Sequence, residues 1–363
     1  MLAIFAFLLQ NEYARCGSQL TTRVKSGRIY LMLKRLLLRA QPLFLLLALI
    51  FIIVLLRNQW DALRAYPWQL HGGWLALSAL FMLASWGMEV TIWQRLLRLV
   101  GGWLPFGSAV RIWFLSAVVR YIPGNIWQPL SMTLYCQRHG IRPEASFTSA
   151  ALYQIVNLLA ATPIAAIYFL WSGNWGLLTD VLSGFTSWLI GLGLLPVVIF
   201  LAKPGWLIDV INWLLYKIGR QALATRLSSL DLLVLLLLGA FNWLLWGAAF
   251  ATLTFALGDY TGAQLLDLTP HLVAVYAIAY AIGFVSFITP SGFGVREGAF
   301  YLLLVPLLDG GVVTVAALAM RFWTMAGEVI LAGLSALADR AWPVSTIDST
   351  VSEVPLAQRN VAS

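Results

Sequence analysis

Residues 232–257 read LLVLLLLGAFNWLLWGAAFATLTFAL, a run of 26 residues without a charged side chain. A helix of about 20 residues is enough to cross the hydrocarbon core of a bilayer. Backbone groups in lipid must be bonded within their own segment, so this run predicts a membrane-crossing helix. Five more stretches are almost as free of charge and of similar length: 36–56, 72–93, 145–171, 185–202 and 312–337.

The composition of the whole chain agrees with lipid as its solvent. Of the 363 residues, 61% are apolar and 10% are charged, whereas a soluble domain carries about 25% charged residues. Trp86, Trp243 and Trp246 lie within apolar runs and are expected to fill the core. Other tryptophans stand near the ends of runs, as in an interfacial aromatic belt: Trp60, Trp74, Trp93, Trp103, Trp171, Trp206 and Trp342.

The remaining composition excludes several classes of site. Two cysteines and three histidines are scattered along the chain, so we expect no disulfide framework, no metal site and no cofactor. A net charge of +8 would suggest nucleic acid as the partner of a soluble protein. Membrane topology explains this charge here, and no nucleic-acid partner is expected.

Two apolar regions, 107–136 and 272–308, are interrupted by Pro and Gly. The first is broken by RYIPGN at 120–125, and its limbs of 13 and 11 residues are too short to cross a bilayer alone. The second is broken by TPSGFGVRE at 289–297; its first limb can cross by itself, but its second limb, 298–308, is too short. Both regions are predicted to form re-entrant helical hairpins with their tips inside the membrane.

The distribution of positive charge sets the orientation. With a cytoplasmic N-terminus, six spans and two hairpins, the cytoplasmic segments hold 18 of the 23 Lys and Arg residues and the outer loops hold two. The positive-inside rule then predicts a multi-pass inner-membrane protein with both termini in the cytoplasm. Each half of the chain reads span, span, hairpin, span in opposite orientations, an inverted 4+4 repeat typical of transporters. Eight full spans stay an open alternative.

The predicted fold is therefore an all-α integral membrane bundle in three parts. Residues 1–35 are expected to form a basic cytoplasmic segment, 36–338 the transmembrane domain, and 339–363 a short disordered cytoplasmic tail. Within the domain, 205–226 are expected to form an amphipathic interfacial helix. Residues 31–35 read LMLKR and resemble a natural start, so translation from Met32 in place of Met1 is an alternative.

Six ionisable side chains remain at membrane depth, where each costs roughly 2.5–3.5 kcal/mol on insertion scales. Such residues indicate function by default, although three Arg and three Glu also allow purely structural ion pairs. Arg321 and Glu328 are seven residues apart, so they share one helix face that is expected to point into the bundle. The six are Glu89, Arg120, Arg296, Glu297, Arg321 and Glu328.

The first tip has the features of an anion site. Pro123 and Gly124 break the helix, and Asn125 can cap the returning half-helix with Gln128 three residues later. Free amides at a helix N-terminus favour an anion, and Arg120 lies just before the tip. A plain cytoplasmic loop with a Pro-Gly turn is the alternative.

The second tip combines backbone freedom with charge. Its Arg296 and Glu297 fall in the first turn of another half-helix. Arg296 can bind a phosphate through two parallel hydrogen bonds. Glu297 can bind Arg120, bind a substrate amine or take up a proton. The residues that allow close backbone approach are Pro290, Gly292 and Gly294.

The motifs RYIPGNIWQ at 120–128 and TPSGFGVREG at 289–298 resemble the lysylphosphatidylglycerol synthase membrane region, also called the flippase-like family. The resemblance covers 36–337 and implies a bundle of about eight apolar segments. It implies transfer of aminoacylated phospholipids or polyprenol-linked sugars between leaflets, and Arg321 stands where members commonly carry Arg. The chain departs from the family at Tyr153, Gln154 and Asn157, where members often carry charge.

Full-length synthases add a large soluble domain that transfers an amino acid from tRNA. Only the 25 residues 339–363 follow the predicted transmembrane domain, so we expect no synthase activity and no catalytic residues in this chain. A separate synthase or glycosyltransferase is an expected kind of partner.

The sequence thus predicts a flippase-like transporter of an anionic lipid or lipid-linked substrate. One alternative is a membrane-embedded transferase using a lipid-linked donor, although the predicted outer loops contain neither a D-x-D motif nor a histidine cluster. The other is a non-transporting partner of envelope enzymes. The predicted substrate-binding residues are Arg120, Pro123, Gly124, Asn125, Gln128, Pro290, Gly292, Gly294, Arg296, Glu297, Arg321 and Glu328.

Overall fold

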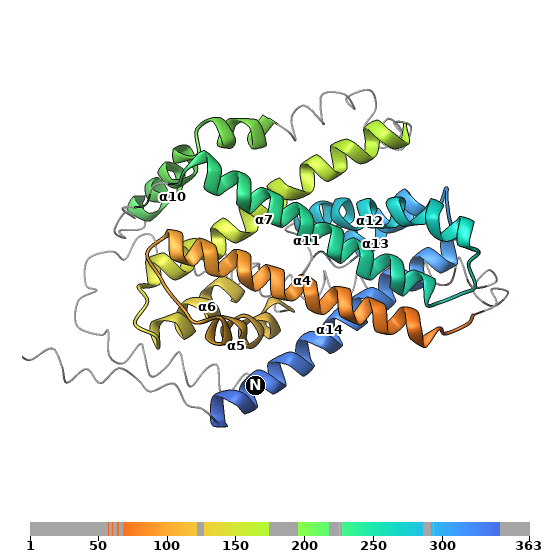
Figure 1. Cartoon of the computed structure of the whole chain (residues 1–363), viewed down its shortest axis with the longest axis horizontal. Coiled ribbons are helices and arrows are strands. Elements are labelled where there is room, and N and C mark those ends of the chain that lie inside the picture. Colours follow the sequence, from red (N-terminus) through yellow and green to blue (C-terminus); the bar gives the residue numbers. More distant parts are fainter. Residues whose placement is uncertain are drawn as a thin grey trace, which may run out of the picture. The chain divides into compact units, whose positions relative to one another are not determined.

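A computed structural model describes residues 68–121, 127–173, 195–217, 227–285 and 294–341, with five isolated positions at 57, 60, 64, 225 and 292. The chain divides into two compact units, Met1–Leu47 and Ala48–Ser363, and every described residue belongs to the second. Within these ranges the secondary structure is helical, and no strand occurs (Figure 1). The predicted all-α bundle is confirmed. The basic N-terminal segment, the C-terminal tail and the first predicted span, 36–56, lie outside the described residues.

The described ranges contain α-helices and one short 3₁₀ turn. They are α4 (Gly72–Leu99), α5 (Phe106–Ala117), the 3₁₀ turn η1 (Val118–Tyr121), α6 (Trp127–Gln137), α7 (Pro143–Ser172), α10 (Gly205–Lys217), α11 (Ser229–Phe255), α12 (Gly262–Val285), α13 (Val295–Leu304) and α14 (Gly310–Ala341).

Five of these helices are long and apolar enough to cross a membrane: α4, α7, α11, α12 and α14. Four of them coincide with predicted spans. The fifth, α12, was expected as one limb of a hairpin, but its 24 residues reach the length of a span. The short limbs are observed as α5, α6 and α13, while the tips that join them, 122–126 and 286–291, lie outside the described residues.

Helix α10 has the character expected of an interfacial helix. The helical segment Leu195–Ala202, the described end of the predicted span 185–202, meets Gly205–Trp213 at 97°. On α10, Trp206 and Trp213 are half exposed, whereas Leu207 and Ile208 are buried. An apolar helix turned by a right angle from a span suits a position along the bilayer surface.

Helix ends follow local sequence signals. At the start of α11, the Ser228 hydroxyl accepts from the Asp231 backbone N–H, and Asp231 accepts from the Ser228 N–H, which completes a capping box. Helix α7 begins with Pro143, whose missing N–H is harmless in the first turn, and ends at Gly173 with a positive φ of 61°.

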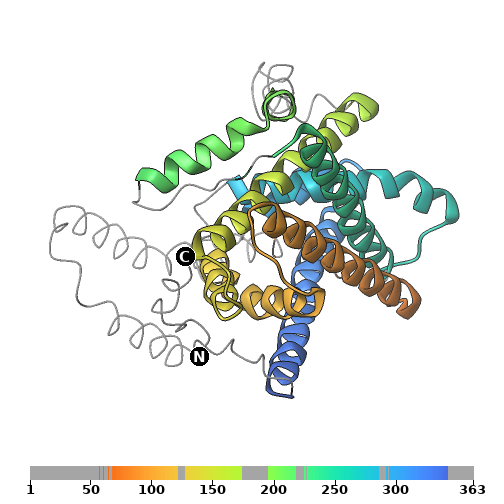
Figure 2. The same ribbon diagram turned by 60° about the vertical axis from the view of Figure 1, so that its left-hand side comes forward.

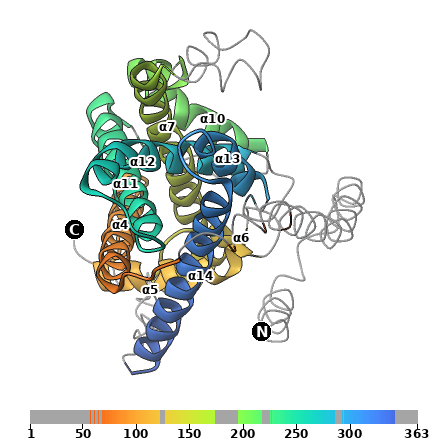
Figure 3. The ribbon, with the colours of Figure 1, turned by 90° about the vertical axis from the view of Figure 1, so that its right-hand side faces the viewer.

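The core forms where α4, α7 and α11 pack against one another. Figures 1 and 2 show α4 and α11 side by side with α7 crossing them, and α12 contacts both α7 and α11. Helix α14 contacts α5, α11 and α13 (Figure 3). Trp86, Trp243 and Trp246 are buried in this core, as predicted. Together these helices bring segments from both halves of the chain around one interior.

One member of the predicted aromatic belt is misplaced. Trp93 is fully buried, and its indole Nε1 donates to the Ser149 hydroxyl at 3.0 Å. The prediction is wrong because α4 does not end at residue 93 but continues to Leu99, where Arg95 and Arg98 are exposed. Trp103, Trp171 and Trp206 are largely exposed, as a belt requires.

Helix α14 separates a lipid-compatible face from a polar one. Its large exposed residues are apolar: Phe322, Val329, Ile330, Leu334 and Leu337. Its Arg321 and Glu328 turn away from them into the bundle, as predicted from their spacing. This division is typical of a helix with lipid on one side and a polar interior on the other.

Glycines set the separation of the core helices. A Cβ at Gly247 of α11 would stand 2.5 Å from the Val273 carbonyl oxygen of α12, and one at Gly239 would stand 2.8 Å from Ala160 of α7. At Gly327 of α14 it would stand 2.5 Å from the Trp86 ring. Small residues at helix crossings allow this close packing in membranes.

We predict that Gly247→Ala lowers the stability of the solubilised protein by about 1–3 kcal/mol, because the added methyl group would meet rigid backbone. The matched control is Gly87→Ala in α4, where nothing lies within 4 Å of the added Cβ. That control is expected to be neutral or slightly stabilising. Thermal unfolding of both variants in detergent checks this, and equal melting temperatures would contradict the described α11–α12 crossing.

Candidate functional site

The six ionisable residues converge from four parts of the chain. Glu89 belongs to α4, Arg120 to η1, Arg296 and Glu297 to α13, and Arg321 and Glu328 to α14. All of them except Glu297 line one or both of two neighbouring cavities of about 60 and 70 Å³. Both cavities are lined by Glu89, Arg120, Tyr280 and Arg296, so the two spaces adjoin the same central group. The predicted charges are therefore brought together in the interior of the bundle.

The first ion pair joins Arg120 to Glu328. The Arg120 Nη1 donates to Glu328 Oε1 at 2.8 Å, and the Glu328 side chain is only 3% exposed. Because Glu328 lies in α14 and Arg120 in η1, the pair links the last long helix to the turn that precedes the first tip. Arg120 was expected to have Glu297 as a candidate partner, but its carboxylate partner is Glu328.

The second ion pair joins Arg321 to Glu297. The Arg321 Nη1 donates to Glu297 Oε1 at 2.8 Å, and the side chains are 11% and 4% exposed. The other oxygen of Glu297 accepts from the Gly294 backbone N–H at 2.7 Å. Glu297 therefore caps α13 and fastens it to α14. The Gly294 N–H at this helix start is thus bonded to the protein's own carboxylate.

Arg296 has aromatic neighbours instead of a carboxylate. Its guanidinium lies 4.7 Å from the ring centroid of Tyr276, 5.4 Å from that of Tyr280 and 5.5 Å from that of Phe300. Cation–π contacts stabilise a guanidinium that is partly removed from water. Among the described residues Arg296 forms no ion pair, so it presents a positive charge to both cavities.

Glu89 is the buried acidic counterpart. It is 7% exposed, and its Oε1 accepts from the Trp246 indole Nε1 at 3.0 Å. Its Oε2 is buried and has no hydrogen-bond partner among the described residues. Of the three Glu and three Arg, Glu89 and Arg296 are thus the two outside the described ion pairs.

The glycines of the second tip adopt the conformations that only Gly tolerates readily. Gly292 has φ of 68° and Gly294 has φ of 85°. A Cβ on Gly292 would stand 2.8 Å from the Gly283 carbonyl oxygen of α12. This close approach places Gly292 directly against Gly283 of α12, and a Cβ on Gly283 would in turn stand 3.0 Å from the Arg296 Cβ.

The remaining predicted site residues divide into two groups. Gln128, in the first turn of α6, is buried and lines the first cavity with Arg120 and Arg296. The residues at the tips themselves lie outside the described residues, and their predicted roles stay predictions: Pro123, Gly124, Asn125 and Pro290.

The aromatic and amide side chains that line the cavities were not predicted from the sequence. Tyr153 and Gln154 line the first cavity and Asn157 lines the second, at the positions where the chain departs from the resembled family. These three polar residues in an otherwise apolar span were the feature of the sequence that could have indicated a polar lining. The other unpredicted lining residues are Trp113, Trp243, Trp246, Tyr276 and Tyr280.

Other chemistries have little support among the described residues. No group of three or more His, Cys, Asp or Glu side chains is placed to hold a metal ion in the described ranges. Cys136 is a buried free thiol. The site is therefore described by charge, hydrogen bonds and aromatic rings alone.

The helices and this enclosed charged site define a multi-pass helical membrane protein with a polar interior. The chain belongs to the family described as the lysylphosphatidylglycerol synthase TM region, whose family model matches residues 40–332. This confirms the resemblance recognised in the two tip motifs. A comparison with curated protein sequences finds no match.

We predict that Arg321→Met lowers stability by about 3–5 kcal/mol, because it leaves Glu297 buried without its counter-charge. Adding Glu297→Gln to that variant is expected to recover part of the loss, since a neutral amide can still cap α13. Unfolding of the two single variants and the double variant in detergent gives the coupling free energy. The control is Arg95→Met on the exposed end of α4; additive effects at positions 297 and 321 would contradict the pair.

Proposed function

We propose that the chain is a flippase-like transporter that moves an anionic lipid, or an anionic lipid-linked substrate, between the leaflets of a membrane. The observation that carries this proposal is the Arg296 guanidinium, which faces two cavities and has no carboxylate partner among the described residues. An unneutralised cation within a bilayer is costly, and such residues mark substrate pathways. A lipid phosphate is the anion that this environment offers.

The chemistry of arginine suits a phosphate. Its planar guanidinium forms two parallel hydrogen bonds to phosphate oxygens, and it remains charged at any physiological pH. The rings of Tyr276, Tyr280 and Phe300 restrict the motion of Arg296, so less side-chain freedom is lost on binding. Arg120 lines the same cavities and adds positive potential, although Glu328 neutralises much of it.

The size of the cavities limits what enters them. If each water molecule takes about 10–15 Å³ of cavity volume, the first cavity, of about 60 Å³, holds roughly four to six waters. That space suits the phosphate and the adjoining part of a head group, but not acyl chains. The chains would stay in the bilayer while the head group passes through the polar interior.

The experiment compares lipid translocation in liposomes by wild type, Arg296→Gln and Arg296→Lys. Acyl-labelled phosphatidylglycerol is followed by quenching of the label in the outer leaflet. We expect Arg296→Gln to reduce the protein-dependent rate at least about tenfold, since a charged hydrogen bond contributes about 1.5–3 kcal/mol. Arg296→Lys is expected to retain part of the rate, because it keeps the charge but loses the two-pronged geometry.

Arg95→Gln is the matched control, because it removes the same charge from an exposed position. Its rate is expected to equal that of wild type. Translocation by wild type at the protein-free rate would defeat the transporter proposal and leave the non-transporting partner. Equal rates for wild type and both Arg296 variants would instead defeat the role of Arg296.

A further inference from the structure

The first cavity is lined by further polar atoms that have no role in binding a phosphate to Arg296. Besides Arg120, three of its lining residues have a buried polar atom without a hydrogen-bond partner among the described residues: Glu89 Oε2, Gln154 Oε1 and Trp113 Nε1. Two of them are acceptors and one is a donor. Buried polar groups are nearly always bonded, so a cluster of three without partners indicates that something else supplies them.

Glu89 is the most demanding of the three. It is 7% exposed, and an unsatisfied carboxylate oxygen at that depth costs more than a neutral acceptor. Trp246 binds its other oxygen at 3.0 Å and so fixes the carboxyl plane. Since one oxygen is fixed by α11, the free oxygen has a defined direction and is ready to accept from a ligand.

The charged and titratable groups around Glu89 do not supply that donor. From η1 and α14 come Arg120 and Glu328, which bind each other. From α13 comes Arg296, which forms no ion pair with Glu89. The phenols facing it, from α7 and α12, are Tyr153, Tyr276 and Tyr280.

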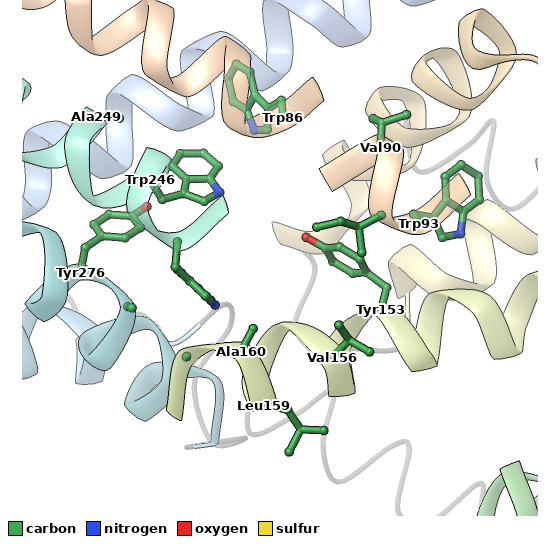
Figure 4. Close-up of a cluster of buried hydrophobic side chains, with 14 of the residues drawn as sticks. Trp86, Val90, Trp93, Tyr153, Val156, Leu159, Ala160, Trp246, Ala249 and Tyr276 are labelled. Carbon is green, nitrogen blue, oxygen red and sulfur yellow. The ribbon is translucent and has the colours of Figure 1, made fainter. Parts of the chain in front are cut away.

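Tyr153 is the phenol best placed to donate a hydrogen bond to the free oxygen of Glu89. Figure 4 shows Tyr153 on α7 and Tyr276 near α12 with their hydroxyls turned toward the interior from opposite sides of the cluster. The Tyr153 hydroxyl lies close to the Glu89 carboxyl. It nevertheless leaves Glu89 Oε2 without a hydrogen bond of acceptable geometry. Tyr153 therefore borders the acceptor site without satisfying it.

We propose that Glu89 Oε2 accepts a hydrogen bond from a donor group, a hydroxyl or an ammonium, on the same lipid head group whose phosphate binds Arg296. This inference rests on the proposed function and adds a specificity-determining residue to it. Gln154 Oε1 supplies a second acceptor in the same cavity. The preferred substrate class is then a phosphodiester lipid with a donor on its head group, rather than any anionic lipid.

The expected selectivity follows from the cost of an unpaired acceptor. A site built to accept a hydrogen bond rejects an analogue without the donor much more strongly than an apolar pocket rejects a missing methylene. In this cavity a head group without a donor would displace water that hydrogen-bonds to Glu89 and would offer no hydrogen bond in its place. The buried carboxylate would then be left unpaired, at a cost in binding free energy. The selectivity therefore does not depend on net charge.

Four acyl-labelled lipids test this in the liposome assay with wild-type protein. Phosphatidylglycerol carries hydroxyl donors, and phosphatidylethanol carries the same charge without any head-group donor. Phosphatidylethanolamine carries an ammonium donor, and phosphatidylcholine carries a quaternary cation without an N–H. We expect both donor lipids to move at least about tenfold faster than phosphatidylethanol, a ratio that corresponds to one buried hydrogen bond. Phosphatidylcholine has a positive charge but no donor, so it is expected to lack the advantage of the two donor lipids.

The variant Glu89→Gln tests the residue itself. It keeps the size of the side chain but removes the charge and one acceptor, so the preference for donor lipids is expected to fall by about tenfold, with the loss greatest for the ammonium. Glu144→Gln, at the start of α7 and outside both cavities, is the matched control and should keep the wild-type preference.

The outcomes separate this proposal from the proposed function. Equal wild-type rates for phosphatidylglycerol and phosphatidylethanol, with Arg296→Gln slow for both, would overturn the role of Glu89 and leave the transporter standing. No transport of any lipid by wild type would overturn both. An unchanged lipid preference in a folded Glu89→Gln variant would also overturn the role of Glu89. If that variant does not fold, the wild-type comparison still decides, because it needs no substitution.

Discussion

Charge buried in a low-dielectric interior must be neutralised or put to use, and this constraint organises the structure. Helix α14 carries an arginine and a glutamate on its inner face, and each is paired with an opposite charge on another element. Those pairs connect α14 to η1 on one side and to α13 on the other. Both partners therefore adjoin the two breaks in the apolar sequence, so the broken helices and the last helix depend on one another.

Ion pairing accounts for four of the six charges and makes the remaining two informative. A purely structural role predicts complete pairing, as the composition of three Arg and three Glu allows. Instead Arg296 rests on aromatic rings and Glu89 keeps one free oxygen beside the same cavities. A head group with a phosphate and a hydrogen-bond donor would find complementary groups there: Arg296 for the phosphate, as in the proposed function, and Glu89 for the donor, as in the further inference.

Much of the fold followed from hydropathy alone, because lipid forbids unpaired backbone groups and so makes apolar length a strong signal. The bounds of α7, α11 and α14 lie within a few residues of the predicted spans. The extension of α4 to Leu99 was not predicted because the charged residues Arg95 and Arg98 suggest the end of a span. A helix can nevertheless continue past such residues, since their long alkyl chains carry the charge to the interface. Helix α12 was predicted as one limb of a hairpin because Pro and Gly follow it, although its own length already allows it to cross a membrane.

The site was predictable in part. Ionisable residues in apolar runs identified all six charges, since few physical reasons other than function or pairing keep them there. Which Arg pairs with which Glu was not predictable, because the partners are 24 and 208 residues apart in the chain. The aromatic support of Arg296 was missed because Tyr276 and Tyr280 look like ordinary apolar residues of a span. The orphaned oxygen of Glu89 depends on the placement of Trp246, which no local pattern reveals.

The central claim is that Arg296 remains available to a lipid phosphate because the other two arginines already have carboxylate partners. The most direct test is a cryo-EM map of the protein in nanodiscs that contain phosphatidylglycerol. The account predicts phosphate density within hydrogen-bonding distance of the Arg296 guanidinium, with the pairs Arg120–Glu328 and Arg321–Glu297 intact. A map in which Arg296 binds Glu89 directly, with no lipid density beside them, would contradict it.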